Sequence, residues 1–449
     1  MQGASEKETT AILNDQKPKV LVITYYWPPA GGPGVQRWLK FVKYLPDFGV
    51  EPVVYVPENP SYPVVDSSFE KEVPPGMEVL KHPVFEPYAF ASWFSGRKKT
   101  REISSGVIAD KKQSFAEKLM LWVRGNFFIP DARVFWVKPS VRFLKSYLEK
   151  ENIRVIITTG PPHSLHLIGM RLKKQCGVHW IADFRDPWTT IGYHRKLKLS
   201  HYARKRHEAL EKEVLHTADR VVATSFTTAD EFREKSGRAV EVITNGYDPT
   251  YTGAVVPDET FTIAHIGSLL TERNPVMLWE ALAELASEHK DLAANLVLKL
   301  AGTVSPEVTD TIRRCGLEPY VRPEGYVSHE EALRLQRAAS VLLLIEIDRP
   351  ETRAIIPGKL FEYLDARRPV IAIGPEGWDV TRIMEETGMG PTYTYGQKEM
   401  VKTRIFRCYE RFLRHKHAMT PSGLQKYSRR SLANRMANLV LEFSEKHAV

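Results

Sequence analysis

The chain has 449 residues, which is long for one hydrophobic core and predicts two domains. Its 43% hydrophobic and 26% charged residues are typical of a soluble globular protein, and its net charge is +9. The three cysteines show no paired spacing, which argues against a disulfide framework or a zinc site and favours a reducing, cytoplasmic compartment. No apolar run approaches the roughly 18 residues that span a bilayer.

The first half of the chain alternates strand-like and helical segments. Residues 1–17 are polar and predict a flexible tail rather than a signal peptide. A long irregular region is expected from about 57 to 130. The strand-like runs are nearly continuous in apolar residues, as in a parallel sheet covered on both faces, and fall at 19–26, 52–56, 154–159, 179–183, 220–225 and 240–244.

The pattern then restarts after a turn near 245–255. Further strand-like runs fall at 261–267, 297–302, 321–327, 341–346 and 369–374, and the chain ends in a long amphipathic helix. We therefore expect an α/β protein with a first domain over 18–248 and a second domain over 249–424. Two such domains would place the loops at the carboxyl ends of their strands face to face, and such crevices bind ligands.

Positive charge is concentrated in one part of the first domain. Residues 80–150 contain 14 Lys/Arg and 6 Asp/Glu together with many aromatic side chains, and residues 193–206 are also basic. This composition favours an anionic membrane surface as a partner, and a solvated face beside ordinary core aromatics explains it nearly as well. None of the common nucleic-acid motifs is present, so no nucleic-acid partner is expected.

A glycine-rich loop follows the first strand, in the stretch ITYYWPPAGGPGVQR over residues 23–37. Gly31, Gly32 and Gly34 either form a simple turn or let backbone N–H groups approach a ligand's phosphates. Their spacing does not match the G-x-G-x-x-G dinucleotide fingerprint, which argues against an NAD-dependent oxidoreductase.

Motifs at the other strand ends are more specific when they are taken together. HIGSLLTERNP (265–275) and IIPGKLFEYLDARRPVIAIG (355–374) lie in the second half, and TTGPPHSLHLIG (158–169), IADFRDPW (181–188) and ADRVVATS (218–225) lie in the first. In this order and spacing the series resembles the GT-B glycosyltransferases of the family-4-like group. The resemblance covers about 19 to 440.

The resemblance implies two Rossmann-like domains around a central cleft, with the C-terminal helix, about 425–449, packing back toward the first domain. It implies transfer of a sugar from a nucleotide diphosphate donor to a glycan or lipid-linked acceptor, usually with retention and without a metal or another cofactor. We expect a role in surface polysaccharide synthesis in the cytoplasm, at the inner face of the membrane.

Carried onto this sequence, the resemblance assigns donor-binding residues in the second domain. Glu362 matches the glutamate that holds the donor ribose, and Gly358 lies beside it. Lys359 and Arg273 are candidate ligands of the diphosphate, and Ser268 stands where the family has an arginine. The family's other glutamate is replaced by Ala354, so a nucleotide-sugar-binding protein without transfer activity is the alternative.

In the first domain the resemblance implies that His163 lies over the donor sugar and that Gly31, Gly32 and Gly34 face the donor's phosphates. His163 can equally cap a helix or belong to the core. Asp186, with Asp183 and Arg185, can orient an acceptor hydroxyl or act as a base, or the carboxylates can brace the loop by pairing with the arginine. The family needs no dedicated protein base, because the leaving phosphate can accept the proton.

Overall fold

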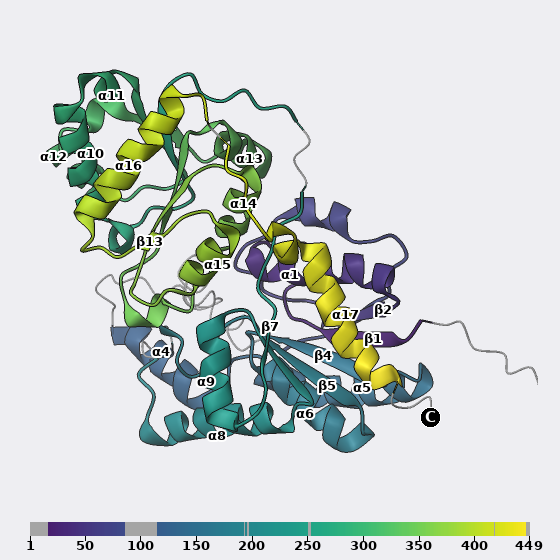
Figure 1. Ribbon diagram of the computed structural model, residues 1–449. Coiled ribbons are helices and arrows are strands. Elements are labelled where there is room, and N and C mark those ends of the chain that lie inside the picture. The colour runs from purple at the N-terminus through teal and green to yellow at the C-terminus, as the bar shows by residue number, and fades with distance from the viewer. Residues whose placement is uncertain are drawn as a thin grey trace, which may run out of the picture.

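The computed structural model describes residues 17–85, 115–192, 194, 197–249, 253–416 and 418–445. Figure 1 shows two lobes, the first in purple to teal and the second in green, with the yellow C-terminal helix crossing back over the first lobe. Of the tail expected at 1–17, all but Lys17 lies outside the described residues.

The first lobe is built on a parallel sheet with the strand order β3-β2-β1-β4-β5-β6-β7. Leu21 at its centre lies beside Val53 of β2 and Ile156 of β4. The strands are β1 (Lys19–Ile23), β2 (Glu51–Pro57), β3 (Val79–His82), β4 (Val155–Gly160), β5 (His179–Phe184), β6 (Arg220–Ala223) and β7 (Glu241–Val242). The inner strands are buried along nearly their whole length, because helices cover both faces.

Two layers of helices enclose this sheet. On one face, the central strands pack against α1 and α17, and on the other against α5, α6, α8 and α9. The helices and 3₁₀ turns of this lobe are α1 (Pro33–Tyr44), η1 (Leu45–Phe48), η2 (Ser67–Glu72), α4 (Phe115–Phe127), α5 (Val134–Lys150), α6 (Ser164–Cys176), α8 (His201–Thr217) and α9 (Phe226–Ser236).

The region expected to be irregular, about 57 to 130, contains η2, β3 and α4 among its described residues. The strand β3 is not predicted by the sequence pattern. It lies at the edge of the sheet, and none of its four residues, VLKH, is fully buried. Such a short edge strand shows neither a continuous apolar run nor clear alternation.

The C-terminal helix α17 (Arg429–Glu445) follows η6 (Leu424–Tyr427) and belongs structurally to the first lobe. Its buried side chains, among them Leu432, Met436, Val440 and Phe443, join the cluster formed by α1 and β1. Burial of each large apolar side chain contributes roughly 1.5–3 kcal/mol, which fixes this helix against α1. The predicted packing of the C-terminal helix onto the first domain is confirmed.

The second lobe repeats the architecture with a parallel sheet in the order β10-β9-β8-β11-β12-β13. The strands are β8 (Phe261–Ile266), β9 (Leu296–Ala301), β10 (Val321–Gly325), β11 (Val341–Ile345), β12 (Val370–Ile373) and β13 (Thr392–Tyr393). The helices and 3₁₀ turns are η3 (Thr271–Arg273), α10 (Val276–Glu288), α11 (Lys290–Asn295), α12 (Pro306–Arg314), η4 (Glu318–Tyr320), α13 (His329–Ala338), η5 (Pro350–Thr352), α14 (Gly358–Ala366), α15 (Asp379–Thr387) and α16 (Lys398–Leu413).

Both sheets are doubly wound: successive strands are added on one side of the first strand and then on its other side, so the order switches between β1 and β4 and between β8 and β11. Ligands of such sheets bind beyond the carboxyl ends of the strands at these switch points. The predicted fold class, two Rossmann-like parallel-sheet domains, is confirmed.

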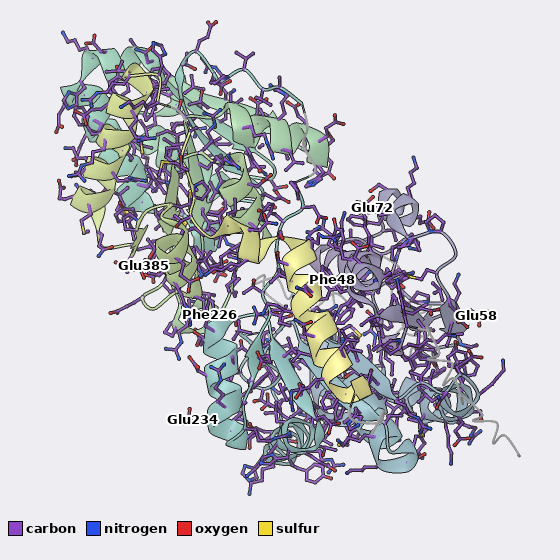
Figure 2. All side chains as sticks on the ribbon, turned by 45° about the vertical axis from the view of Figure 1, so that its right-hand side comes forward. Phe48, Glu58, Glu72, Phe226, Glu234 and Glu385 are labelled. Atoms are coloured by element: carbon purple, nitrogen blue, oxygen red, sulfur yellow. The ribbon has the colours of Figure 1, made fainter. Side chains whose placement is uncertain are left out.

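The chain passes between the lobes twice, between β7 and β8 and between α16 and α17. The lobes also contact each other away from these two connections. Asp379, at the start of α15, accepts hydrogen bonds from the backbone N–H (2.9 Å) and hydroxyl (2.6 Å) of Thr227 at the start of α9. Arg382 lies over the ring of Phe226, which Figure 2 shows at the end of α9 nearest the second lobe. These contacts hold the lobes together on one side of the connection between β7 and β8, which we call the hinge.

Candidate functional site

A cavity of about 280 Å³ lies between the lobes, where the N-terminal ends of α1 and α14 approach each other. Helix α1 belongs to the first domain, α14 to the second, and the hinge and α17 complete the wall. The lining residues are Gly32, Gln36, Arg37, Phe41, Thr244, Asn245, Gly246, Gly358, Lys359, Glu362, Arg429 and Leu432. Two helix N-termini at one cavity favour an anionic ligand.

Lys359 lies in the first turn of α14, directly after the exposed Gly358. Its Nζ occupies the space beside Gly267, because a Cβ built on Gly267 would lie 2.8 Å from it, and Gly267 also has a φ of +120° that disfavours other residues. Burial, followed by the nearby charge of Arg273, lowers the pKa of Lys359 to about 8. An anion in the cavity would stabilise its charged form.

Glu362 follows one turn later on α14 and also lines the cavity. Gln336 on α13 donates a hydrogen bond from Nε2 to Oε2 of Glu362 at 2.9 Å, and Gln336 is buried. Within the described residues the other carboxylate oxygen receives no hydrogen bond, which leaves it available to a ligand hydroxyl.

Arg273 lies at the end of η3 and does not line the cavity. Its guanidinium is paired with Glu346, which follows β11, through Nη2 at 2.8 Å and Nε at 3.1 Å. Ser268, beyond the end of β8, is exposed. Ala354 is partly exposed in the loop before α14, which Trp378 braces by donating to the Ile355 carbonyl at 2.7 Å.

The three glycines of the first domain lie in different environments. Gly32 precedes α1, with a φ of 101°, and lines the cavity. The N–H of Gly31 donates to the Val64 carbonyl at 2.9 Å, and a Cβ on Gly31 would lie 2.8 Å from the Val64 side chain. The Gly34 carbonyl accepts a hydrogen bond from Arg185 Nη1 at 3.3 Å. Only Gly32 of the three lines this cavity.

Arg37 of α1 is held by a buried ion pair with Asp183, at the end of β5, with 2.7 Å between Nη2 and Oδ1. Nη1 of Arg37 also donates to the Thr244 carbonyl at 2.9 Å. Asp183 accepts further bonds from Trp38 and Thr159, both at 2.9 Å. Burial alone would raise the pKa of Asp183, but Arg37 and these donors together hold it below its ordinary value. The carboxylate therefore braces the cavity wall, through Arg37 rather than Arg185.

We expect Asp183→Asn to lower the free energy of unfolding by about 3–5 kcal/mol, because it leaves the Arg37 guanidinium buried without its counter-ion. Urea unfolding at neutral pH measures the change. The exposed Asp230 on α9 serves as the matched control, since Asp230→Asn should change stability by no more than about 0.5 kcal/mol. Equal effects of the two substitutions would contradict a bracing role.

His163 and Asp186 lie elsewhere in the first domain and do not line the cavity. His163 is 3% exposed and stacks on Trp188 at 4.8 Å, and neither ring nitrogen has a hydrogen-bond partner in the described part of the chain. Burial, and then His166, lower the pKa of His163 well below its ordinary value, so its ring is neutral at pH 7. Burial raises the pKa of Asp186, against the opposing charge of Arg185.

A second cavity of about 290 Å³ adjoins the first and shares Gln36, Glu362 and Arg429 with it. Asp66, Tyr247 and His329 are among its other lining residues. The shared residues make the two cavities parts of one interdomain cleft, with Glu362 at their junction.

Three residues of this region have no sequence signal that we recognised. Arg429 of α17 donates to Gln36 Oε1 at 3.0 Å and to the Gly246 carbonyl at 3.1 Å, which ties α17, α1 and the hinge together at the cavity. Gln336 donates a hydrogen bond to Glu362, and Glu346 forms an ion pair with Arg273. In both cases the partners come from distant parts of the chain. A search of the strand ends for charged residues would have found only Glu346.

The comparisons with known proteins agree with this architecture. Residues 119–246 match the family described as Glycosyl transferase 4-like domain. No curated protein matches the chain in sequence.

Solved structures match over nearly the whole chain. Sucrose-phosphate synthase from Thermosynechococcus elongatus has a TM-score of 0.59 and 15% identity, covering 96% of this chain and 100% of that one. The lipopolysaccharide outer core galactosyltransferase WaaB has a TM-score of 0.56 and 14% identity, covering 94% and 99%. S. aureus TarM, in a complex containing UDP, has a TM-score of 0.56 and 11% identity, covering 94% and 99%. The fold is therefore that of the GT-B glycosyltransferases, and the family match lies within its first domain, as the motifs predict.

Two further findings concern the described residues. No group of three or more His, Cys, Asp or Glu side chains among them could hold a metal ion. Among the helices that the structure describes, none has both the length and the apolar composition that crossing a membrane requires.

Proposed function

We propose that this protein is a retaining glycosyltransferase that moves a hexosyl group from a nucleotide diphosphate donor to a glycan or lipid-linked acceptor. The observation that carries the proposal is the interdomain cavity in which Lys359 and Glu362 of α14 face Gly32 and Gln36 of the first domain. It combines a cation, an available carboxylate oxygen and two helix N-termini in one space.

Each group has a role that its chemistry permits. The free oxygen of Glu362 accepts a hydrogen bond from a ribose hydroxyl, while Gln336 fixes the other oxygen. Lys359 and the N-terminus of α14 stabilise the charge that develops on the diphosphate as the glycosidic bond breaks. In this proposal the leaving phosphate accepts the acceptor's proton, and no metal is required. His163 remains a candidate for the donor sugar and Asp186 for the acceptor.

Titration of the purified protein with a panel of nucleotide sugars, read by thermal shift and by release of nucleoside diphosphate, tests this function. Binding raises the apparent stability according to RT ln(1 + [L]/Kd), so the true donor should stand out from the panel. Release of nucleoside diphosphate that requires an acceptor glycan supports transfer. A protein that neither binds nor turns over any member of the panel would overturn the proposal.

A nucleotide-sugar-binding protein without transfer activity is the second candidate. It is favoured by Ala354 in place of the family's glutamate and by the pairing of Arg273 with Glu346, which leaves fewer groups for the reaction centre. Donor-induced stabilisation without release of nucleoside diphosphate in the presence of any acceptor would select this candidate.

We propose further that the first domain meets an anionic membrane surface at the cytoplasmic face, where a lipid-linked acceptor in surface polysaccharide synthesis would lie. Helix α4 exposes Trp122 (41%) and Phe127 (68%), whose rings contact at 5.7 Å. Helix α8 adjoins α4 at the lower left of Figure 1. Asn126 Oδ1 on α4 accepts a hydrogen bond at 2.7 Å from the N–H of Ser200, which precedes α8. The exposed Arg204, Lys205 and Arg206 follow on α8. Aromatic and basic side chains together suit a membrane interface.

We expect the double substitution Trp122→Ser and Phe127→Ser to reduce binding to vesicles containing anionic lipid by about tenfold or more, because two interfacial aromatic side chains are lost. Co-sedimentation measures the bound fraction. Leu413→Ser, at an equally exposed position at the end of α16 in the second domain, serves as control and should bind as the wild type does. Equal binding to neutral vesicles, or no loss in the double variant, would contradict the membrane role.

A further inference from the structure

Glu346 is a nearly fully buried carboxylate at the switch point of the second sheet. It directly follows β11, its side chain is 1% exposed, and its backbone N–H donates to the Ile373 carbonyl at 2.9 Å. Its own carbonyl accepts from the Tyr395 hydroxyl at 2.9 Å. Both backbone polar groups of Glu346 are therefore hydrogen-bonded. Its carboxylate is held at the carboxyl end of β11, where ligands of this fold bind.

Among the described residues, one carboxylate oxygen of Glu346 accepts all the hydrogen bonds that its side chain makes. Oε1 accepts from Arg273 at 2.8 and 3.1 Å and from the Ile347 N–H at 2.8 Å. Arg273 is therefore not a free cation in the donor-free protein. Within the described residues Oε2 accepts no hydrogen bond, so the pair retains capacity for rearrangement.

The charges of this pair act on Lys359, whose Nζ lies against Gly267 just beyond the end of β8. Arg273 from η3, Glu346 after β11 and Glu362 on the same helix all act electrostatically on Lys359. Burial, and then the charges of Lys359 and Arg273, in turn lower the pKa of His265 in β8. Burial and Arg273 lower the pKa of Lys359, whereas Glu346 and Glu362 oppose that shift. A diphosphate entering this group meets two carboxylates as well as two cations.

We propose that Glu346 is a positioning residue that competes with the diphosphate for Arg273 and thereby limits how tightly the nucleoside diphosphate product is held. The inference rests on the proposed function, because it presumes a diphosphate at Lys359. In the donor-free protein Glu346 aligns Arg273. With a donor bound, the guanidinium is shared with or transferred to phosphate, and after transfer Glu346 takes it back as the product leaves.

The variant Glu346→Gln tests this inference, since the amide oxygen can still accept from Arg273 while the charge is removed. Isothermal titration of wild type and variant with UDP, GDP, ADP and inorganic pyrophosphate should show binding about tenfold tighter in the variant at pH 7. Steady-state kinetics should show a lower donor KM together with a lower kcat, because the product leaves more slowly.

The pH profile separates this role from simple bracing. Without Glu346 the charged form of Lys359 loses a stabilising neighbour, so its pKa falls further and the cation is lost at lower pH. The advantage of the variant should therefore shrink as the pH rises from 7 to 9. A residue that only braced Arg273 would give weaker binding in the variant at every pH.

Glu272→Gln is the matched control, because Glu272 precedes Arg273, carries the same charge and pairs with the exposed Arg349 instead. It should change binding less than twofold. The inference is supported if Glu346→Gln binds more tightly than the wild type and Glu272→Gln does not. This holds even if wild-type binding is too weak to measure. Unchanged or weaker binding, with a wild type that binds, overturns the inference and leaves the proposed function standing. Absence of binding in both proteins overturns both.

A structure of the wild type with a bound nucleoside diphosphate gives a second test, which does not depend on folding of the variant. A phosphate oxygen within hydrogen-bond distance of Arg273 supports the inference. An Arg273 that keeps both bonds to Glu346 and makes no phosphate contact overturns it.

Discussion

Glu362→Ala is expected to reduce kcat/KM for the nucleotide-sugar donor by about 100-fold or more. The substitution removes a charged acceptor for the ribose hydroxyls, and each hydrogen bond to a charged group contributes roughly 1.5–3 kcal/mol. It also leaves the buried amide of Gln336 without the partner that it contacts at 2.9 Å. Donor titration by thermal shift should show the loss as a missing stabilisation, and initial rates should show it in turnover.

Glu385→Ala is the appropriate control for this experiment. Glu385 lies on α15 in the same domain, is exposed, and appears in Figure 2 on the outer side of the second lobe. It should leave both donor binding and rate within a factor of two. If Glu362→Ala bound donor as tightly as the wild type, the assignment of the ribose to α14 would be wrong.

The fold could be predicted from the sequence because each of its units is local. The apolar runs around Val22 and Leu343 are long and continuous, which indicates parallel strands covered on both faces, and the motif from Gly358 to Glu362 lies on one short helix. Such features depend only on residues close together in the chain, so they can be recognised from the sequence. The two-domain arrangement then follows from the repeat of the pattern.

The pairs that shape the cleft could not be predicted in the same way. Arg37 and Asp183 are 146 residues apart, and Arg273 and Glu346 are 73 apart. Nothing in the local sequence distinguishes a cation that will face a ligand from one that will be paired across a sheet. Gly31, Gly32 and Gly34 illustrate the same limit. These glycines lie within four residues, yet the first makes a close contact with Val64, the second precedes a helix and the third accepts from an arginine.

Lys359→Met is expected to have opposite effects on ligand binding and on stability. Methionine retains most of the apolar stem beside Gly267 and removes the charge. Affinity for nucleoside diphosphates should fall by about 10- to 100-fold at pH 7, as is usual when a charge-assisted contact to phosphate is lost. In the absence of ligand the melting temperature should rise by a few degrees, because the fold no longer has to bury an ammonium group.

The stability and the diphosphate affinity of the wild type should both change with pH as Lys359 titrates. Burial lowers the pKa of Lys359 from 10.5 to about 8 in the folded protein, so between these values the unfolded chain binds more protons than the folded chain. Stability contributed by this group therefore rises as the pH increases from about 8 to 10.5. Diphosphate affinity changes in the other direction, because the cation is lost over the same range.

Lys290→Met separates these effects from a general change in charge, since Lys290 lies exposed at the start of α11 in the same domain. It should alter neither the melting temperature nor the affinity appreciably. Calorimetry and nucleotide titration at pH 7 and pH 9 therefore provide four comparisons for each variant. A Lys359→Met protein that melts earlier than the wild type but still binds diphosphate would show that the lysine stabilises the fold and that the anion lies elsewhere in the cleft.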